Sequence, residues 1–304
     1  QITSALTKSS QRIKETKNLI PVAFKALNLA KDGIPGPIHL AIAADILAGD
    51  LGNGISDLKQ VHKRTEDVLQ PTGTLIKSLA SAEKPLIIVG PFFGMPFYTD
   101  KLKKLENQLN IPVVLMESPR GFNDPRLGNI KSMISLADLI IVIGKPVDFT
   151  LSYGSLEVFK QDTEWFVYIG CEELLKQARS NLGNRLKEGK NIAPLAAIDM
   201  FEKLELKKAV ASEWLASLRK AIDCRDFCIS DKADDQDELN SLTFALTINK
   251  ILSSRKDVIA VSDGGEIGQW VQSFLSRYLV MINGTSGAIG GSLSYAMAIK
   301  LTYP

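Results

Sequence analysis

The sequence predicts an α/β protein built on a doubly wound parallel sheet, and two observations carry this prediction. Continuous apolar runs of strand length occur at residues 84–90, 111–116, 138–144 and 164–170. A helical pattern lies between the first two, at residues 98–110. Continuous runs indicate strands covered on both faces, and their alternation with helices indicates βαβ units. With right-handed crossovers, residues 73–205 should form a Rossmann-like domain of about six strands.

The flanking segments carry weaker patterns of the same kind. Residues 11–31 are predicted to form one amphipathic helix, with an apolar stripe made of Ile13, Leu19, Ile20, Ala23, Leu27 and Ala30. A Gly/Pro turn and a short strand follow in "GIPGPIHLAIAADI" at residues 33–46. Beyond the central region we expect helices at residues 211–223 and 237–253 and a strand at residues 257–263.

These patterns divide the chain into three parts and two linkers. The predicted division is residues 1–47, a linker at 48–72, the central domain at 73–205, a second linker at 206–236 and residues 237–304. The first and last parts offer one or two strands each, too few to bury their faces alone. The N-terminus has neither an initiating Met nor the apolar region of a signal peptide. We therefore expect this chain to be a window of a longer one.

Composition excludes several classes of function. The net charge of +2 argues against nucleic acid as a partner and against a polybasic membrane patch. No apolar run approaches the roughly 18 residues of a membrane span. The cysteines number three, Cys171, Cys224 and Cys228, and this low, odd count favours a reducing, cytoplasmic compartment. Cys224 and Cys228 lie four apart without further metal ligands nearby, so a structural role is favoured.

The two histidines offer little catalytic chemistry. His39 lies in an apolar strand-like run, which favours a core residue with satisfied hydrogen bonds, and His62 lies in the polar "QVHKR". Neither a Ser-His-Asp arrangement nor a His-rich metal site is evident, so we assign no catalytic and no metal-ligating residue. Catalysis by this protein would therefore depend on a cofactor.

Two glycine-rich turns open predicted helices near the end of the chain. They are "SDGGEIGQW" at residues 262–270 and "GTSGAIGGSL" at residues 284–293. Such a turn presents free N–H groups and the positive end of a helix dipole, which suits a phosphate. Neither turn has the dinucleotide-binding or P-loop spacing. The pattern alone leaves open whether the glycines serve ligand binding or close packing of helices.

Three segments, in order, resemble the thiamine diphosphate-dependent enzymes of the acetolactate synthase and benzaldehyde lyase group. "GIPGPIHLAIAADI" resembles the end of their pyrimidine-binding domain. "KPLIIVGPFFG", "IPVVLMESPRG" and "ADLIIVIGKPVDFTLSYG" resemble their central domain. "VSDGGEIGQWVQ" and "INGTSGAIGGSLSYAMA" resemble the opening of their diphosphate-binding domain. The resemblance implies a carbon–carbon lyase or ligase that acts on a 2-keto acid or 2-hydroxy carbonyl substrate.

The resemblance also implies which residues contact the cofactor. Residues Gly265, Glu266 and Ile267 would lie near the diphosphate, where the acidic Glu266 departs from the family pattern and should point away. The Gly287 carbonyl would accept a hydrogen bond from the aminopyrimidine, and Ile289 would be the apolar wedge beneath the bent cofactor. Small neighbours, Ala288 among them, would make room for that wedge. The alternative for Ile289 is an ordinary core residue.

Other parts of the family pattern do not appear in this chain. The activating glutamate and the motif that holds Mg²⁺ are assigned to no residue here, so this chain alone is expected to be inactive. Phe92 and Phe93 occupy positions where a dinucleotide site needs small residues, which argues against FAD in the central domain. Arg120 is the best candidate there for contact with an anion. The resemblance further implies a homodimer or homotetramer.

Two other interpretations remain open at this point. One is a non-catalytic member of the same fold, retained for assembly or regulation. The other is an unrelated α/β protein that binds NAD, FAD or a CoA ester through its central domain. A thermal shift screen with these ligands and thiamine diphosphate would separate the second from the enzyme.

Overall fold

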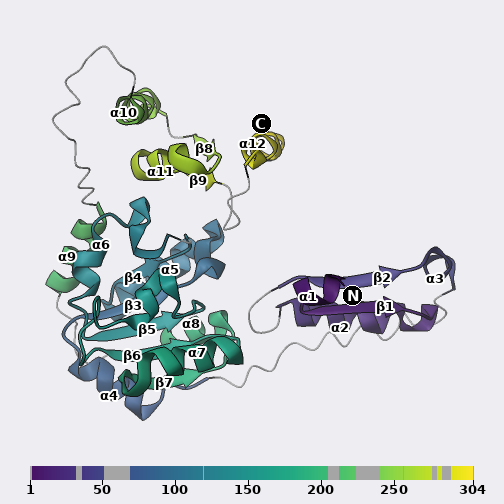
Figure 1. Ribbon diagram of the computed structural model, residues 1–304, viewed down its shortest axis with the longest axis horizontal. Coiled ribbons are helices and arrows are strands. Elements are labelled where there is room, and N and C mark those ends of the chain that lie inside the picture. The colour runs from purple at the N-terminus through teal and green to yellow at the C-terminus, as the bar shows by residue number, and fades with distance from the viewer. Residues whose placement is uncertain are drawn as a thin grey trace.

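The structure of the protein is a computed structural model (Figure 1). It describes residues 2–31, 36–50, 69–118, 120–204, 212–223, 240–255, 257–275, 279–282 and 289–303. His62, Cys224 and Cys228 lie outside these ranges, as does most of the predicted linker at 48–72.

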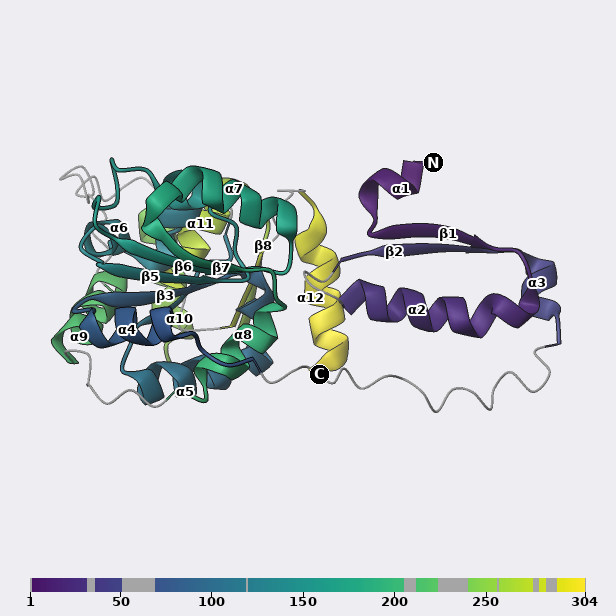
Figure 2. The same cartoon turned by 90° about the horizontal axis from the view of Figure 1, so that it is seen from below.

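The N-terminal part is a βαβ unit. Strand β1 (Ser9–Ile13) pairs in parallel with β2 (Ile38–Ile42), and helix α2 (Leu19–Lys31) lies along both strands (Figures 1 and 2). The prediction of one helix over residues 11–31 is therefore wrong at its beginning. Pairing with β2 overrides the local pattern at Gln11–Ile13, because strand formation depends on the neighbouring strand more than on intrinsic propensity. Short helices α1 (Ile2–Leu6) and α3 (Ala44–Ala48) and the 3-10 turn η1 (Thr16–Asn18) complete the unit.

A five-stranded parallel sheet forms the central part and confirms the predicted fold class. Its strands are β3 (Pro85–Val89), β4 (Val113–Leu115), β5 (Leu139–Ile143), β6 (Glu164–Tyr168) and β7 (Leu186–Lys190). Their order is β4-β3-β5-β6-β7. Strand β4 is therefore added on one side of β3, and the later strands are added on the other side, beginning with β5. The described residues thus give five strands where about six were expected. The edge strand β7, "LKEGK", has a polar sequence that hides it from a search for apolar runs.

Helices cover both faces of this sheet. They are α4 (Gly73–Ser81), α5 (Thr99–Leu109), α6 (Ile130–Ile134), α7 (Glu172–Leu182) and α8 (Pro194–Phe201). Short 3-10 turns connect them: η3 (Pro91–Gly94), η4 (Pro96–Tyr98), η5 (Gly121–Asn123), η6 (Pro125–Leu127), η7 (Phe149–Gly154) and η8 (Gly183–Arg185). Figure 2 shows α7 on one face and α5 and α8 on the other. The strand residues Ile87, Ile141 and Phe166 are fully buried between these layers, as continuous apolar runs predict.

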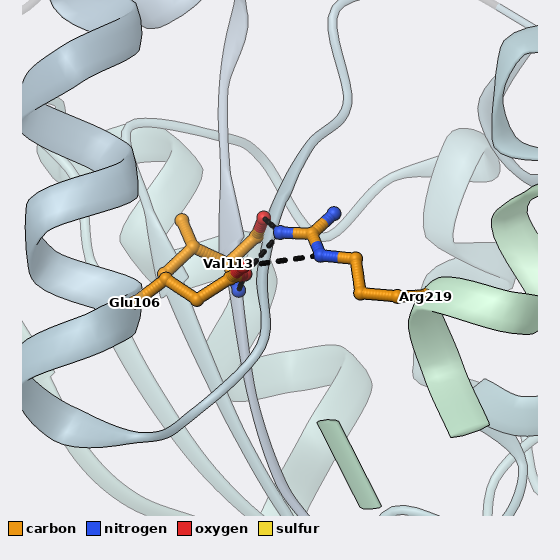
Figure 3. A network of polar contacts seen from close by, with 3 residues as sticks. All are labelled: Glu106, Val113 and Arg219. Atoms are coloured by element: carbon orange, nitrogen blue, oxygen red, sulfur yellow. Dashed lines mark hydrogen bonds and ion pairs between the residues drawn. The ribbon is translucent and has the colours of Figure 1, made fainter. Parts of the chain in front are cut away.

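Helix α9 (Ser212–Asp223) lies in the segment predicted as a linker, yet it packs on the central sheet. The Trp214 indole N–H donates a hydrogen bond to the Pro85 carbonyl oxygen at 2.7 Å. The Arg219 guanidinium binds the Glu106 carboxylate and donates to the Val113 carbonyl oxygen at 3.0 Å (Figure 3). Glu106 in turn accepts from the Val113 N–H at 2.7 Å, so one carboxylate joins α9, α5 and β4.

The C-terminal part contains a second parallel pair of strands. Its elements are α10 (Ser241–Leu252), β8 (Ile259–Ser262), α11 (Gly265–Phe274), β9 (Leu279–Ile282) and α12 (Gly291–Thr302), with β8 beside β9. Helix α11 packs against α10 and against η6 of the central part. No helix in the described part of the chain has both the length and the apolar character to cross a membrane.

Candidate functional site

The first glycine turn connects β8 to α11. Strand β8 ends at Ser262, and α11 begins at Gly265 with the residue before it, Gly264, offering no side-chain cap. Gly265 has a φ of +75°, a conformation that L side chains rarely adopt, and nothing lies within 4 Å of the position a Cβ would take. The backbone at the start of α11 is therefore bare and has open space above it.

The second glycine turn opens α12. Gly287 and Ala288 lie outside the described residues. Ile289 is 88% exposed in the described structure. Gly290, the N-cap of α12, has a φ of +95° and again has open space where a Cβ would stand. An apolar side chain therefore stands next to uncovered backbone at this turn.

Asp263 joins the two turns. Its Oδ1 accepts hydrogen bonds from the Gly290 N–H at 3.2 Å and from the Ser292 N–H at 3.1 Å. The pKa of Asp263 is lowered, first by the Ser292 N–H and further by the Ser292 hydroxyl and the N–H groups of Gly290 and Gly291. The turns thus lie together, as two converging glycine turns require. The N–H groups at α12 that were expected to be free are, however, already partnered.

Sequence patterns gave no signal for the role of Asp263. A helix N-cap is normally the residue just before the helix, and Gly290 there has no side chain. The carboxylate that replaces it comes from 27 residues upstream in the chain. Only the pairing of β8 with β9 places the two turns at one end of the same pair of strands.

Other residues singled out from the sequence lie on α11 and on β2. Ile267 lies in the first turn of α11 and is partly exposed, with 42% of its surface accessible. Glu266 belongs to the same turn, but its side chain is outside what the structure describes. Among the described residues no group of His, Cys, Asp or Glu is arranged to hold a metal ion. His39 is half-buried in β2, where its Nδ1 lies 3.1 Å from the Ser10 hydroxyl.

The central sheet has its own switch point, at the carboxyl ends of β3 and β5, where open α/β sheets bind ligands. Here backbone meets backbone, because a Cβ on Gly90 would lie 2.0 Å from the Gly144 carbonyl oxygen. Phe93 is buried beside Gly144 and packs edge-on against Phe92. Lys145 is buried at the same end of the sheet, and burial lowers its pKa against the opposing effect of Asp148.

The loop after β4 carries the candidate anion contact, Arg120. The Arg120 N–H donates to the Ser118 hydroxyl at 3.2 Å, and its guanidinium lies near buried Asp124. Burial raises the pKa of Asp124, while the Arg126 N–H and the charges of Arg126 and Arg120 act in the opposite direction. Asp124 therefore lies within electrostatic range of Arg120 and competes with any external anion for its charge.

Fold and site together define a class: an α/β protein in which a parallel central sheet is accompanied by paired glycine turns at helix openings. No family model matches the sequence. Individual relatives do, and they are 2-hydroxyacyl-CoA lyases and acetolactate synthases. The chain is related to these enzymes, and the resemblance expected from its sequence is confirmed.

Three relatives illustrate the extent of the match. 2-Hydroxyacyl-CoA lyase 2 of Danio rerio is 24% identical over 366 residues, covering 98% of this chain and 55% of the relative. The acetolactate synthase large subunit of Lactococcus lactis is 22% identical, covering 100% and 54%. Human 2-hydroxyacyl-CoA lyase 1 is 24% identical, covering 96% and 52%. The chain thus spans about half the length of the curated relatives it matches.

Proposed function

We propose that this chain is part of a thiamine diphosphate-dependent enzyme that cleaves or forms a carbon–carbon bond next to a carbonyl group. The observation that carries the proposal is the junction at Asp263, which joins two glycine turns in a chain related to lyases and synthases. We assign residues 1–47 to the end of a pyrimidine-binding domain, 73–205 to the central domain and 237–304 to the start of a diphosphate-binding domain.

The described residues fit such a cofactor. Gly265 and Gly290 leave open space above backbone in a left-handed conformation, so a flat ligand could lie against them without a Cβ in its way. Ile289 projects into solvent beside that space, as a wedge under the ligand would need. The start of α11, with no side-chain cap, would receive the diphosphate at the positive end of the helix.

The cofactor, when bound, acts as an electron sink that the side chains of this protein do not provide. The chain's own residues bind and orient it: Gly265 to Ile267 at the diphosphate, and Gly287 to Ile289 at the aminopyrimidine. The lowered pKa keeps Asp263 ionised, and the N–H dipoles of the α12 turn offset part of its repulsion of a diphosphate. Mg²⁺, for which we assign no ligand among these residues, would supply positive charge that offsets the charge of the diphosphate.

The wider biology follows from the same proposal. The substrate would be a small 2-keto acid or 2-hydroxy carbonyl compound, in keeping with relatives that are named 2-hydroxyacyl-CoA lyases and acetolactate synthases. The enzyme would be a cytoplasmic homodimer or homotetramer.

The test is a calorimetric titration of the protein, at the length of its relatives, with thiamine diphosphate and Mg²⁺. We expect binding, and we expect ADP, FAD, NAD and coenzyme A to bind more weakly. Ile289→Ala should lower turnover at least tenfold, roughly 1.4 kcal/mol of barrier. Leu293→Ala is the matched control, because Leu293 is also exposed but lies on α12 itself, past the turn.

Each other outcome has a meaning. Binding of FAD, NAD or coenzyme A in place of thiamine diphosphate would favour a nucleotide-binding protein that uses its central domain. Absence of all binding would favour a non-catalytic relative of the enzymes.

A further inference from the structure

Asp263 holds the peptide group on which Ile289 is mounted. The bond it accepts comes from the Gly290 N–H, which belongs to the planar peptide that begins at the Cα of Ile289. Its second bond, from the Ser292 N–H, fixes the first turn of α12. Two bonds to one oxygen therefore restrain both the direction of Ile289 and the start of the helix that follows.

Asp263 is itself held firmly. The Ser262 hydroxyl donates to the Asp263 carbonyl oxygen at 2.8 Å. Gly268, in the first turn of α11, lies so close that a Cβ there would be 2.8 Å from the same oxygen. The residue that restrains the second turn is thus anchored to the first, and a side chain works best as a restraint when its own backbone is fixed.

We propose that Asp263 is a positioning residue that sets the Ile289 turn at the correct distance and angle from the opening of α11. This inference rests on the proposed function. In it, Asp263 touches no part of the cofactor and acts through the turn that carries Ile289. Because its carboxylate fills the N-terminus of α12, a diphosphate is directed to α11 and the aminopyrimidine to the turn at Ile289.

Because the two turns would bind different parts of the cofactor, loss of Asp263 should change the affinities for two ligands by different amounts. Thiamine diphosphate would use both turns, whereas inorganic diphosphate would use only the opening of α11. Asp263→Ala should weaken binding of thiamine diphosphate by about tenfold or more, the effect of losing hydrogen bonds to a charged group. Its binding of inorganic diphosphate should stay within about twofold of the wild type, under about 0.5 kcal/mol, because that ligand would not contact the turn at Ile289. Asp263→Asn keeps an acceptor oxygen and should recover much of the affinity.

The experiment is a calorimetric titration of the whole protein, with Mg²⁺ present, using these two ligands. Asp257→Ala is the matched control, because it removes an exposed carboxylate just before β8, one that pairs with Arg255. We expect it to leave both affinities unchanged. Hydrogen exchange at the Gly290 and Ser292 amides gives a direct reading of the restraint, and should be faster in Asp263→Ala.

The outcomes separate the inference from the function on which it rests. If the wild type binds no thiamine diphosphate, the proposed function and the inference are both refuted. If the wild type binds thiamine diphosphate and Asp263→Ala binds each ligand as tightly as the wild type does, only the inference is refuted. Equal loss of both ligands would mean that Asp263 merely maintains the fold, which also refutes it. Should Asp263→Ala fail to fold, Asp263→Asn must still lose more affinity for thiamine diphosphate than for inorganic diphosphate.

Discussion

Replacing Arg219 with Met tests how α9 is held on the central sheet. Arg219 donates through Nε to the Glu106 carboxylate at 3.1 Å and through Nη2 to the Val113 carbonyl oxygen at 3.0 Å. Met keeps the apolar stem of the side chain but removes every donor. The Glu106 side chain is only 14% exposed, so its carboxylate would stay desolvated, with the Val113 N–H as its remaining partner among the contacts described here.

The magnitude follows from the exposure of the two partners. Breaking a buried ion pair typically costs about 3–5 kcal/mol, and an exposed pair contributes about 0–1 kcal/mol. Arg219 is 41% exposed while Glu106 is largely buried, so this pair lies between the two classes. We expect R219M to lower the free energy of unfolding by about 2 kcal/mol, the middle of the range for hydrogen bonds to charged groups.

Urea unfolding followed by circular dichroism measures this change, and thermal unfolding should show a Tm about 4–8 °C lower for a unit of this size. The control is R179M on α7, which removes an ion pair with Glu172 whose partners are 50% and 41% exposed. It should cost under about 0.5 kcal/mol. A double-mutant cycle with E106Q should give a coupling energy above about 0.5 kcal/mol. Equal losses of unfolding free energy in R219M and R179M would refute the explanation that the cost comes from leaving the buried Glu106 carboxylate without its partner.

Two further substitutions probe the carboxyl end of the central sheet. Gly90→Ala should destabilise the protein at the upper end of the roughly 1–3 kcal/mol that overpacking costs, since its Cβ would strike the Gly144 carbonyl. Gly73→Ala, which has open space, should be neutral or slightly stabilising in the same urea assay, and a similar loss at both sites would contradict this. Lys145 has a pKa lowered by burial, so the unfolded chain holds its proton more tightly, and stability should rise with pH between the folded pKa and 10.5. Lys145→Met should remove that rise, while Lys131→Met, at an exposed site, should leave it; urea midpoints from pH 7 to 11 decide this.

The sheet could be predicted where burial is complete and not where it is partial. Strands β3, β5 and β6 lie between two layers of helices, and their sequences are continuous apolar runs. Strand β7 lies at an edge and carries Lys187, Glu188 and Lys190, so its sequence resembles a loop. Strand β1 is hidden for a related reason, because "SSQRI" becomes a strand only through its pairing with β2.

The candidate site divides in the same way. The glycine turns were predictable, since a positive φ and close approach of a ligand both require glycine, and glycine is visible in a sequence. The bond from Asp263 to Gly290 depends on how β8 and β9 are paired, which no local pattern specifies. The placement of Gly287 and Ala288 is outside the described residues, so their contacts with the cofactor stay predictions.

The glycines of this protein differ in how they would respond to replacement by L-alanine or by D-alanine. Gly290 has a φ of +95°, which suits a D-alanine and strains an L-alanine, although nothing lies within 4 Å of the position of the L-alanine methyl group. At Gly90 the obstacle is the Gly144 carbonyl oxygen, 2.0 Å from the position of an L-alanine methyl group, and the backbone conformation is not the constraint. A mirror-image residue introduced by chemical ligation would therefore tell the two requirements apart. At Gly290 the open space is the one that an L-alanine methyl group would enter, so that methyl group would occupy the place where a flat ligand is proposed to lie.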